Sequence, residues 1–426
     1  MSSLNRINQT QSPSQVTPEK QLRRLVMSAM LWEKQFYIDG QSVAEAIKAL
    51  VPLVNPNVVA VLAMQARGDY KLRHMPLLLC RELARSGMLP WKVLNEVIQR
   101  PDEMSEFLAI YWLEGRTALS NQVKKGIAAA FGKFNEYSLA KWDKNSAAIS
   151  LRDVMFLTHP KPQNPEQEAL FHRVANKDLK TPDTWETELS KGADKAKTFT
   201  RLMAEKKLGA LAFLRNLRNM LEAGVSATAI NNYSISVDVA RVLPFRYVAA
   251  ARIVPAMAPM LEAMMVRSLK EAPKLSGHTA LLVDVSGSMF GTKISAKSDL
   301  DRFDAAAALA MLCKEVCENV DVYTFSNSLV KVDGVSGFAM INALKNSQNN
   351  GGTALGMAIR NLPREYGRLI VFTDEQSQDA VGAAPAEKSY IINVAANKNG
   401  IEHASYTKID GFSEAVIDYI RESEKE

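Results

Sequence analysis

Three oxygen-bearing side chains stand at alternate positions after a short apolar run. The run Thr279–Val283 has the composition of a buried strand, and Asp284, Ser286 and Ser288 follow it. Because alternate residues of an extended backbone point the same way, the carboxylate and both hydroxyls should converge on one point. Gly287 allows the backbone to turn sharply beneath them. One carboxylate with two hydroxyls forms a hard-oxygen site suited to Mg²⁺, Mn²⁺ or Ca²⁺.

Two later segments can supply further oxygen ligands. Thr353 follows two glycines at the start of a helical stretch, and Asp374 ends the apolar run Arg368–Thr373. In a parallel sheet, ligands gather at the carboxyl ends of the strands. A lone Asp-x-Ser-x-Ser would be read as a polar turn, but three segments in this order favour a metal centre. The sequence therefore predicts a divalent metal centre, with Mg²⁺ preferred, formed by Asp284, Ser286, Ser288, Thr353 and Asp374.

The composition is that of a soluble globular protein with two or three domains. The chain has 426 residues, of which 47% are hydrophobic and 23% are charged. No apolar run reaches the ~20 residues of a membrane span, and residues 1–20 lack the apolar core of a signal peptide. Three cysteines cannot form a disulfide framework, and Cys313 and Cys317 are expected to be small core residues rather than metal ligands. We expect a cytoplasmic protein without a membrane partner.

The charges are unevenly distributed along the chain. Residues 1–275 contain 38 Lys and Arg against 26 Asp and Glu, whereas residues 276–426 contain 14 against 20. A basic first part and an acidic second part predict a polyanionic partner for the first part only.

The periodicity of the apolar residues divides the chain into three segments. Residues 1–18 are polar and lack periodicity, which predicts a disordered or draped tail. Residues 19–272 contain many short helical patterns, including one over 244–267, and predict helices stacked in pairs. In residues 273–426 four apolar strands alternate with helices, which predicts a doubly wound parallel sheet with the metal loops on one edge. The expected fold class is thus multi-domain, α followed by α/β.

Two known families resemble these segments. The order Asp-x-Ser-x-Ser, then Thr, then Asp resembles the metal-ion-dependent adhesion site of von Willebrand factor A domains, with all five positions present. The helical segment resembles the TROVE module of the Ro ribonucleoprotein family, whose members carry such an A domain after the helices. Five blocks in order carry this second resemblance: Leu72–Leu79, Lys124–Trp142, Leu151–Pro162, Ala212–Gly224 and Val242–Tyr247.

The resemblance to Ro proteins implies a ring of HEAT-like helices, an α-solenoid, that is closed by the A domain. It implies a non-catalytic protein that binds structured small noncoding RNA of the Y-RNA type on a basic outer surface. It also implies that single-stranded 3′ ends of misfolded RNA enter the central hole, for RNA quality control or within a ribonucleoprotein. A nuclease or another protein docking at the metal site is a further expected partner, and we expect a monomer.

The same resemblance assigns RNA binding to Lys141, Lys144 and His159 on the outer surface. His159 is alternatively a residue at the end of a helix, satisfied by the backbone. Lys and Arg neutralise phosphates and release counterions. Four further basic residues either line the hole or form a solvated basic face: Arg116, Lys124, Lys125 and Lys133. For six others both an RNA contact and a structural role stay open: Arg73, His74, Tyr137, Trp142, Arg215 and Arg218.

An enzymatic function is not expected, because the sequence contains no recognisable nucleophile–base pair, phosphate-binding loop or His-rich metal cluster. The alternative to RNA binding is a metal-dependent adaptor between proteins. In that case the A domain would dock an acidic residue of a partner, and the helical segment would be a passive scaffold. The excess of positive charge in residues 1–275 favours RNA binding.

Overall fold

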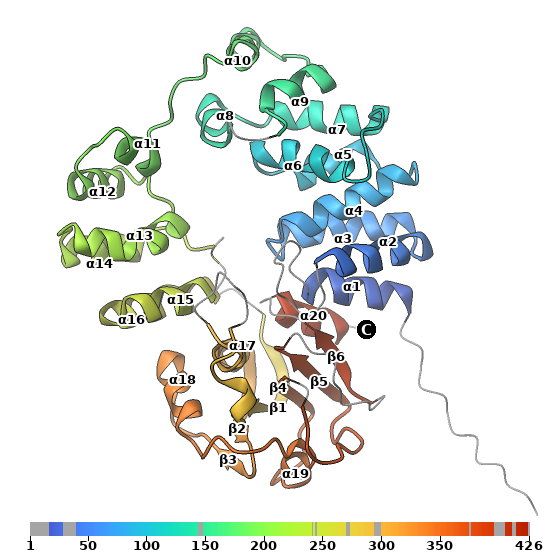
Figure 1. Cartoon of the computed structure of the whole chain (residues 1–426), viewed down its shortest axis with the longest axis vertical. Coiled ribbons are helices and arrows are strands. Elements are labelled where there is room, and N and C mark those ends of the chain that lie inside the picture. The colour runs from blue at the N-terminus through green and yellow to red at the C-terminus, as the bar shows by residue number, and fades with distance from the viewer. Residues whose placement is uncertain are drawn as a thin grey trace, which may run out of the picture.

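Helices form the first part of the chain, and a β-sheet flanked by helices forms the last part (Figure 1). The computed structural model describes residues 17–28, 40–143, 148–240, 242, 245–269, 273–293, 300–374, 376–395, 405–410 and 415–424. The helices before the sheet are α1 (Pro18–Ser28), α2 (Gly40–Leu50), η1 (Val51–Leu53), α3 (Pro56–Gly68), α4 (His74–Arg85), α5 (Trp91–Val97), α6 (Pro101–Tyr111), α7 (Asn121–Phe131), α8 (Glu136–Trp142), α9 (Leu151–Thr158), α10 (Pro165–Asn176), α11 (Trp185–Ser190), α12 (Lys195–Ala204), α13 (Ala210–Glu222), α14 (Ala227–Ser236), α15 (Phe245–Ile253), η2 (Pro255–Met257) and α16 (Ala258–Leu269). Among the described residues no helix is both long and apolar enough to span a membrane.

The sheet has six strands in the order β3-β2-β1-β4-β5-β6. Its elements are β1 (Leu275–Asp284), η3 (Gly287–Met289), α17 (Arg302–Val316), β2 (Cys317–Phe325), β3 (Leu329–Lys331), α18 (Gly337–Lys345), α19 (Leu355–Arg360), β4 (Arg368–Thr373), β5 (Lys388–Asn393), β6 (Thr407–Asp410) and α20 (Ala415–Ser423). All neighbouring strands are parallel except β2 and β3. The expected alternation of strands and helices is confirmed, but the sheet is mixed. Only three residues join β2 to β3, and so short a connection can make only an antiparallel pair.

Helices cover both faces of the sheet because alternate residues of its central strand enter different cores. Leu281 and Val283 of β1 pack in the core that contains α17, whereas Ala280 and Leu282 pack in the core that contains α19. Helix α17 is buried along almost its whole length, which accounts for its run of alanines. Cys313 and Cys317 are buried, as predicted for small core residues.

Proline interrupts the helix that was expected over 244–267. Helix α15 ends at Ile253, the short 3-10 helix η2 begins at Pro255, and α16 begins at Ala258. Pro255 has no amide hydrogen to donate and its ring clashes with the preceding turn. Helix α16 ends at Leu269 and β1 begins at Leu275, on either side of the expected domain boundary at residue 272. Of the expected tail, only Thr17 and Pro18 are described, and Pro18 begins α1.

The two ends of the helical part both contact the sheet part (Figure 1). At one end, α1 packs on α20 and β6, and Arg24 Nη1 donates to the carbonyl oxygen of Lys408 at 2.8 Å. At the other end, α16 packs on α17 and α18, and Arg252 of α15 pairs with Asp304 of α17. Both ends of the helical part are therefore packed against the sheet part.

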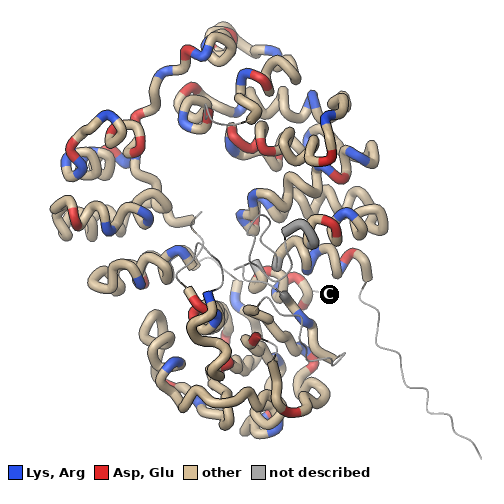
Figure 2. Tube along the Cα trace, in the orientation of Figure 1, with Lys and Arg blue, Asp and Glu red and all other residues tan. Residues whose placement is uncertain are grey.

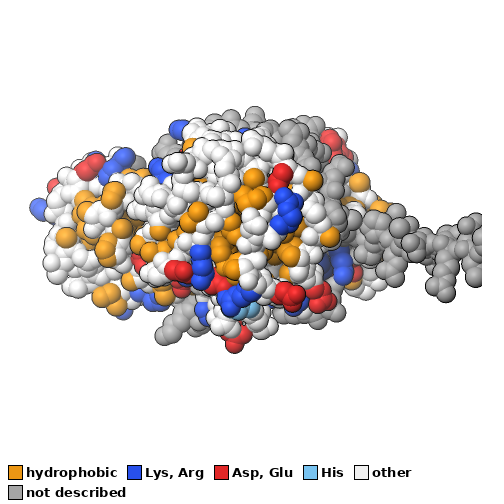
Figure 3. Space-filling model, turned by 90° about the horizontal axis from the view of Figure 1, so that it is seen from below, with side chains coloured by type: hydrophobic (Ala, Val, Ile, Leu, Met, Phe, Trp, Pro, Cys, Tyr) orange, Lys and Arg blue, Asp and Glu red, His pale blue; other side chains and the backbone are white. Residues whose placement is uncertain are grey.

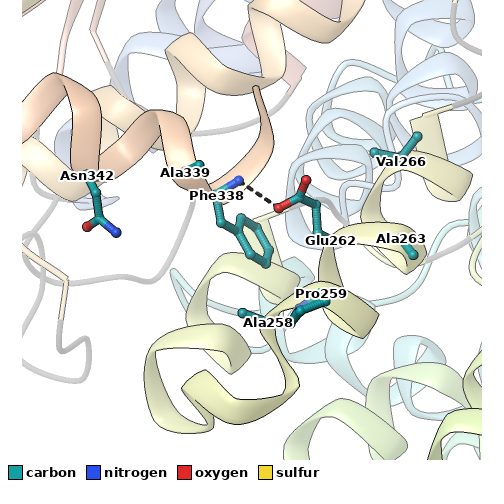
Figure 4. A pocket seen from close by; sticks show the side chains of 8 residues that line it. All are labelled: Ala258, Pro259, Glu262, Ala263, Val266, Phe338, Ala339 and Asn342. Carbon is teal, nitrogen blue, oxygen red and sulfur yellow. Dashed lines mark hydrogen bonds between the residues drawn. The ribbon is translucent and has the colours of Figure 1, made fainter. Parts of the chain in front are cut away.

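Helices α16 and α18 meet beside a groove of about 690 Å³ (Figure 4). The Glu262 carboxylate accepts a hydrogen bond from the Phe338 backbone N–H at 3.0 Å, at the start of α18. A Cβ atom at Gly337 would lie 2.0 Å from a Glu262 carboxylate oxygen, so a larger residue there would displace the Glu262 side chain. The face of the molecule seen from below mixes hydrophobic, basic and acidic side chains (Figure 3).

An ionic network joins α3, α4 and α6. Glu103 is fully buried and pairs with Arg67 at 2.6 Å, and it also accepts hydrogen bonds from the backbone N–H groups that precede α6. Asp102 pairs with Arg73 at 2.7 Å and with Arg100 at 2.5 Å. Acidic and basic residues accordingly lie side by side at the start of α6 (Figure 2). Removing one partner would leave a buried charge uncompensated, so the network fixes the relative position of the three helices.

Gly126 permits the close packing of α5 and α7. A Cβ atom there would lie 2.9 Å from the Trp91 carbonyl oxygen and 3.0 Å from the Leu94 Cβ. We expect Gly126→Ala to lower the free energy of unfolding by about 1–3 kcal/mol, because backbone must move to relieve the overlap. Equilibrium denaturation with urea measures this. Gly68→Ala is the matched control, since Gly68 lies in α3 with no atom within 4 Å of the added Cβ. Equal stability of the two variants would contradict the packing argument.

The environment of His74 should make the stability of the folded chain depend on pH. Burial and the charges of Arg73 and Arg100 lower the pKa of His74 from 6.5 to about 4, although Glu106 Oε2 lies 3.8 Å from its Nε2. Between those pH values the unfolded chain binds the proton more readily, so the free energy of unfolding falls as the pH falls from about 6.5 to about 4. We expect His74→Gln to weaken this loss in thermal melts across that range. The control is His172→Gln at an exposed residue of α10, which should melt as the wild type does at each pH.

Candidate metal centre and nucleic-acid interface

The two aspartates of the predicted metal centre follow neighbouring central strands. Val283 of β1 pairs with Phe372 of β4, so Asp284 and Asp374 emerge together at the carboxyl edge of the sheet. Both carboxylates are fully buried. Because β1 and β4 are buried, the carboxylates at their ends lie in the interior, where an opposite charge is needed to stabilise them.

Hydrogen bonds orient Asp284 at this edge. Its Oδ1 accepts from the Ser286 backbone N–H at 2.8 Å, and its Oδ2 accepts from the Thr373 hydroxyl at 2.7 Å. Ser286 Oγ and Ser288 Oγ lie 3.2 Å apart, so the two hydroxyls converge, although Ser288 lies in the 3-10 helix η3 and not on the extended backbone that was expected. Burial raises the pKa of Asp284 to about 7, against the hydrogen bonds from Ser286 and Thr373 that lower it. A cation bound nearby would favour the charged form of this carboxyl group.

The loop that carries Thr353 packs against the serine loop. The Gly287 backbone N–H donates to the Gly351 carbonyl oxygen at 3.1 Å. Ser326, at the carboxyl end of β2, accepts from the Gly351 N–H at 2.9 Å and donates to the Gly352 carbonyl at 3.0 Å. Thr353 itself is buried. The structure thus gathers all three predicted segments at one edge of the sheet.

The donor set fits a small divalent cation. Two buried carboxylates repel each other unless a cation lies between or beside them, and hydroxyl oxygens complete the kind of oxygen shell that Mg²⁺ prefers. Among the described residues no group of three or more His, Cys, Asp or Glu side chains is arranged to hold a metal ion. A centre at this edge therefore depends on hydroxyls as much as on carboxylates.

Three contributors to this edge were not anticipated from the sequence. Thr373 and Ser326 hold Asp284 and the glycine loop, and each is a polar residue at the end of an apolar strand, which was the available signal. Arg302 Nη1 donates to Asp374 Oδ2 at 3.0 Å. The sequence feature that could have drawn attention to Arg302 is its place in the first turn of a predicted helix, where the helix dipole disfavours positive charge.

The predicted RNA-binding residue Lys141 lies on α8 beside aromatic rings. Its ammonium nitrogen is 5.7 Å from the centre of the Tyr137 ring and 5.8 Å from the centre of the Trp142 ring. On Trp142 the guanidinium carbon of Arg100 lies at 3.7 Å. Lys141 and Tyr137 are exposed and Trp142 is half-buried, so cations and rings reach the surface together.

A second set of cations and rings lies on α5, on α7 and in the connection between α6 and α7. The Lys125 ammonium group is 5.0 Å from the centre of the Trp91 ring, and the Arg116 guanidinium carbon is 4.8 Å from the centre of the Trp112 ring. Both cations are exposed and both rings are half-buried. Lys124, which precedes Lys125 in α7, is half-buried.

The other candidates differ in how they are held. Lys133 donates to the carbonyl oxygens of Asn95 and Ile98 at the end of α5, and burial lowers its pKa, so this ammonium group has a structural role. His159 is exposed in the left-handed conformation after α9, and its N–H donates to the Met155 carbonyl at 2.8 Å. Its backbone therefore caps the helix while its ring remains accessible. Lys144 lies outside the described residues.

The arginines for which both an RNA contact and a structural role were left open also differ in how they are held. Arg73 pairs with Asp102 and Glu106, which gives it a structural role in the ionic network. Arg218 makes a solvent-exposed pair with Glu222 at 3.6 Å, and Arg215 is exposed on the same helix.

Comparisons with known proteins bear on both parts of the chain. Residues 173–274 match the model of the TROVE domain, a stretch that contains the blocks Ala212–Gly224 and Val242–Tyr247. The other three blocks and the residues assigned to RNA or to the hole, from Arg116 to His159, precede this stretch. No curated protein sequence matches the chain.

A solved structure matches the chain over almost its whole length. It is the crystal structure of the Ro (RSR) protein of Deinococcus radiodurans, which is 18% identical, with a TM-score of 0.65. The match covers 95% of this chain and 98% of the other. Residues 173–274 therefore match the TROVE domain, and the chain as a whole has the same fold as the Ro protein of Deinococcus radiodurans.

Proposed function

We propose that the chain is a non-catalytic RNA-binding protein of the Ro type. The observation that carries this proposal is the set of cations that lie against aromatic rings on α5 to α8, in a chain that contains a TROVE domain. Cations neutralise phosphates, and a neighbouring ring offers a face on which an unpaired base can stack. RNA with unpaired bases uses both features, whereas the mixed charges of the face seen from below (Figure 3) suit a polyanion less well.

Two RNA sites are proposed on the helical part. Lys141, His159 and the neighbouring rings would bind structured small noncoding RNA on the outer surface. The contacts of the sheet with both ends of the helical part support a closed ring of HEAT-like repeats, through whose hole the single-stranded 3′ ends of misfolded RNA would pass. Such a protein would serve RNA quality control or form the scaffold of a ribonucleoprotein, as a monomer in the cytoplasm.

The metal centre has a separate role in this proposal. Asp284, Ser286, Ser288, Thr353 and Asp374 would hold Mg²⁺ in a von Willebrand A-like domain, and a metal ion there would accept a carboxylate from a partner protein such as a nuclease. Docking through this centre alone, with the helices as a passive scaffold, is the second candidate function. The buried pair of carboxylates favours a metal centre in either case.

Charge reversal on the proposed RNA surface should weaken RNA binding. We expect Lys125→Glu with Lys141→Glu to weaken binding of a structured RNA with a single-stranded 3′ tail by about tenfold or more near physiological salt, and to reduce the slope of log affinity against log salt by about one for each lost phosphate contact. Filter binding at several salt concentrations measures both quantities. The control is Lys191→Glu with Lys345→Glu, which changes the net charge equally at two exposed residues, one directly after α11 and one at the end of α18. If both double variants bind alike, α7 and α8 are not part of the site.

Loss of the metal should leave RNA binding intact. We expect Asp284→Ala to abolish Mn²⁺ binding measured by electron paramagnetic resonance, because it removes a buried carboxylate from the centre. Affinity for the same RNA should change by less than about twofold, since the charged groups on α7 and α8 are untouched. A large loss of RNA affinity in a folded Asp284→Ala protein would mean that the two sites are not separate.

A further inference from the structure

Arg302 brings a positive charge of the protein itself to the metal centre. It is the first residue of α17, and its Nη1 lies 3.0 Å from Asp374 Oδ2 and 3.4 Å from the carbonyl oxygen of Ser288. The Arg302 side chain is 13% exposed and the Asp374 side chain is 0% exposed. One guanidinium nitrogen therefore contacts both an expected metal ligand and the backbone of another.

The position of Arg302 opposes an ordinary preference of helices. The start of a helix carries partial positive charge, so a cation in the first turn is disfavoured there unless another group compensates. Asp374 provides that compensation. A local preference overridden in this way marks a residue whose contact with the site outweighs its contribution to the helix.

The backbone of Arg302 is held in place by the residues around it. Asp301 and Asp304 bond reciprocally around it, with N–H to carboxylate distances of 2.8 and 2.9 Å. Asp304 also pairs with Arg252 of the helical part, and Asp301 accepts from the Gly291 N–H. The guanidinium group can leave Asp374 only by a change of rotamer, because the start of α17 is fixed on three sides.

We propose that Arg302 is a built-in competitor of the divalent metal ion. With its guanidinium group on Asp374, Arg302 neutralises one of the two buried carboxylates and keeps the edge folded when no metal is bound. A metal ion needs the same carboxylate, and two cations in direct contact repel each other. Metal binding therefore requires the guanidinium group to swing away, and the affinity for the metal is lowered by the cost of that displacement. This inference rests on the proposed metal centre.

The competition can be measured by Mn²⁺ binding to the full chain. We expect Arg302→Gln to tighten the binding of Mn²⁺ by about tenfold, since a pair of close charges no longer has to be broken. Arg302→Lys retains a cation and should bind nearly as the wild type does. The matched control is Arg360→Gln, which removes one positive charge from a residue of α19 that pairs with Asp379. It should leave the affinity unchanged. Arg302→Gln combined with Asp284→Ala should not bind Mn²⁺.

Thermal unfolding provides a readout that does not depend on the binding assay. In the presence of a chelator we expect Arg302→Gln to melt below the wild type, because the charge of Asp374 is left uncompensated. On addition of Mn²⁺ its melting temperature should rise by more than that of the wild type, as tighter binding to the folded state requires.

The outcomes separate this inference from the proposal on which it rests. Equal or weaker Mn²⁺ binding by a folded Arg302→Gln protein, beside a wild type that binds, would overturn the competition and leave the metal centre standing. Absence of Mn²⁺ binding in both proteins would overturn the metal centre and the competition together. Mn²⁺ binding by Arg302→Gln alone would support the competition in its strongest form.

Discussion

Two buried carboxylates at the ends of neighbouring strands impose the main electrostatic constraint on the sheet part of this chain. Asp284 and Asp374 follow the two central strands β1 and β4, and neither is accessible to water. Much of the surrounding structure reduces the resulting cost. Thr373 and the serine loop donate hydrogen bonds, and Arg302 supplies a positive charge from the start of α17. Such an arrangement tolerates few substitutions, because each group compensates for another.

Local patterns were sufficient to predict the elements that carry this site. Runs of apolar residues indicated the four long strands, and the carboxyl ends of those strands indicated where Asp284 and Asp374 would lie. Pro255 is a helix-breaking residue that is visible in the sequence. The apolar pattern on both sides of it nevertheless led to the prediction of one continuous helix. Strands β3 and β6 have three and four residues, too few for a periodic signal to develop.

The contacts that were not predictable join residues far apart in the sequence. Arg302 meets Asp374 from 72 positions away, and Lys133 reaches the end of α5 from 35 positions away. A lysine on a basic face and a lysine that caps a helix have the same appearance in a sequence. Only the packing of the neighbouring helix distinguishes Lys133, whose nitrogen is engaged, from Lys125, which lies on the Trp91 ring at the surface. Local sequence therefore does not distinguish a lysine that faces a partner from one that binds the backbone of a neighbouring helix.

The contact between α1 and α20 has a consequence for the order of folding during synthesis. Helix α1 is synthesised before β6 and α20, yet the surface against which it packs includes both of them. The helical part can assemble progressively from its local pairs of helices. Helix α1 can pack on β6 and α20 only after the elements between them in the chain have been synthesised. Contacts between elements so far apart in sequence form slowly, and the apolar face of α1 is exposed in the meantime. Until β6 and α20 have been made, this face of α1 is open to aggregation or to capture by a chaperone.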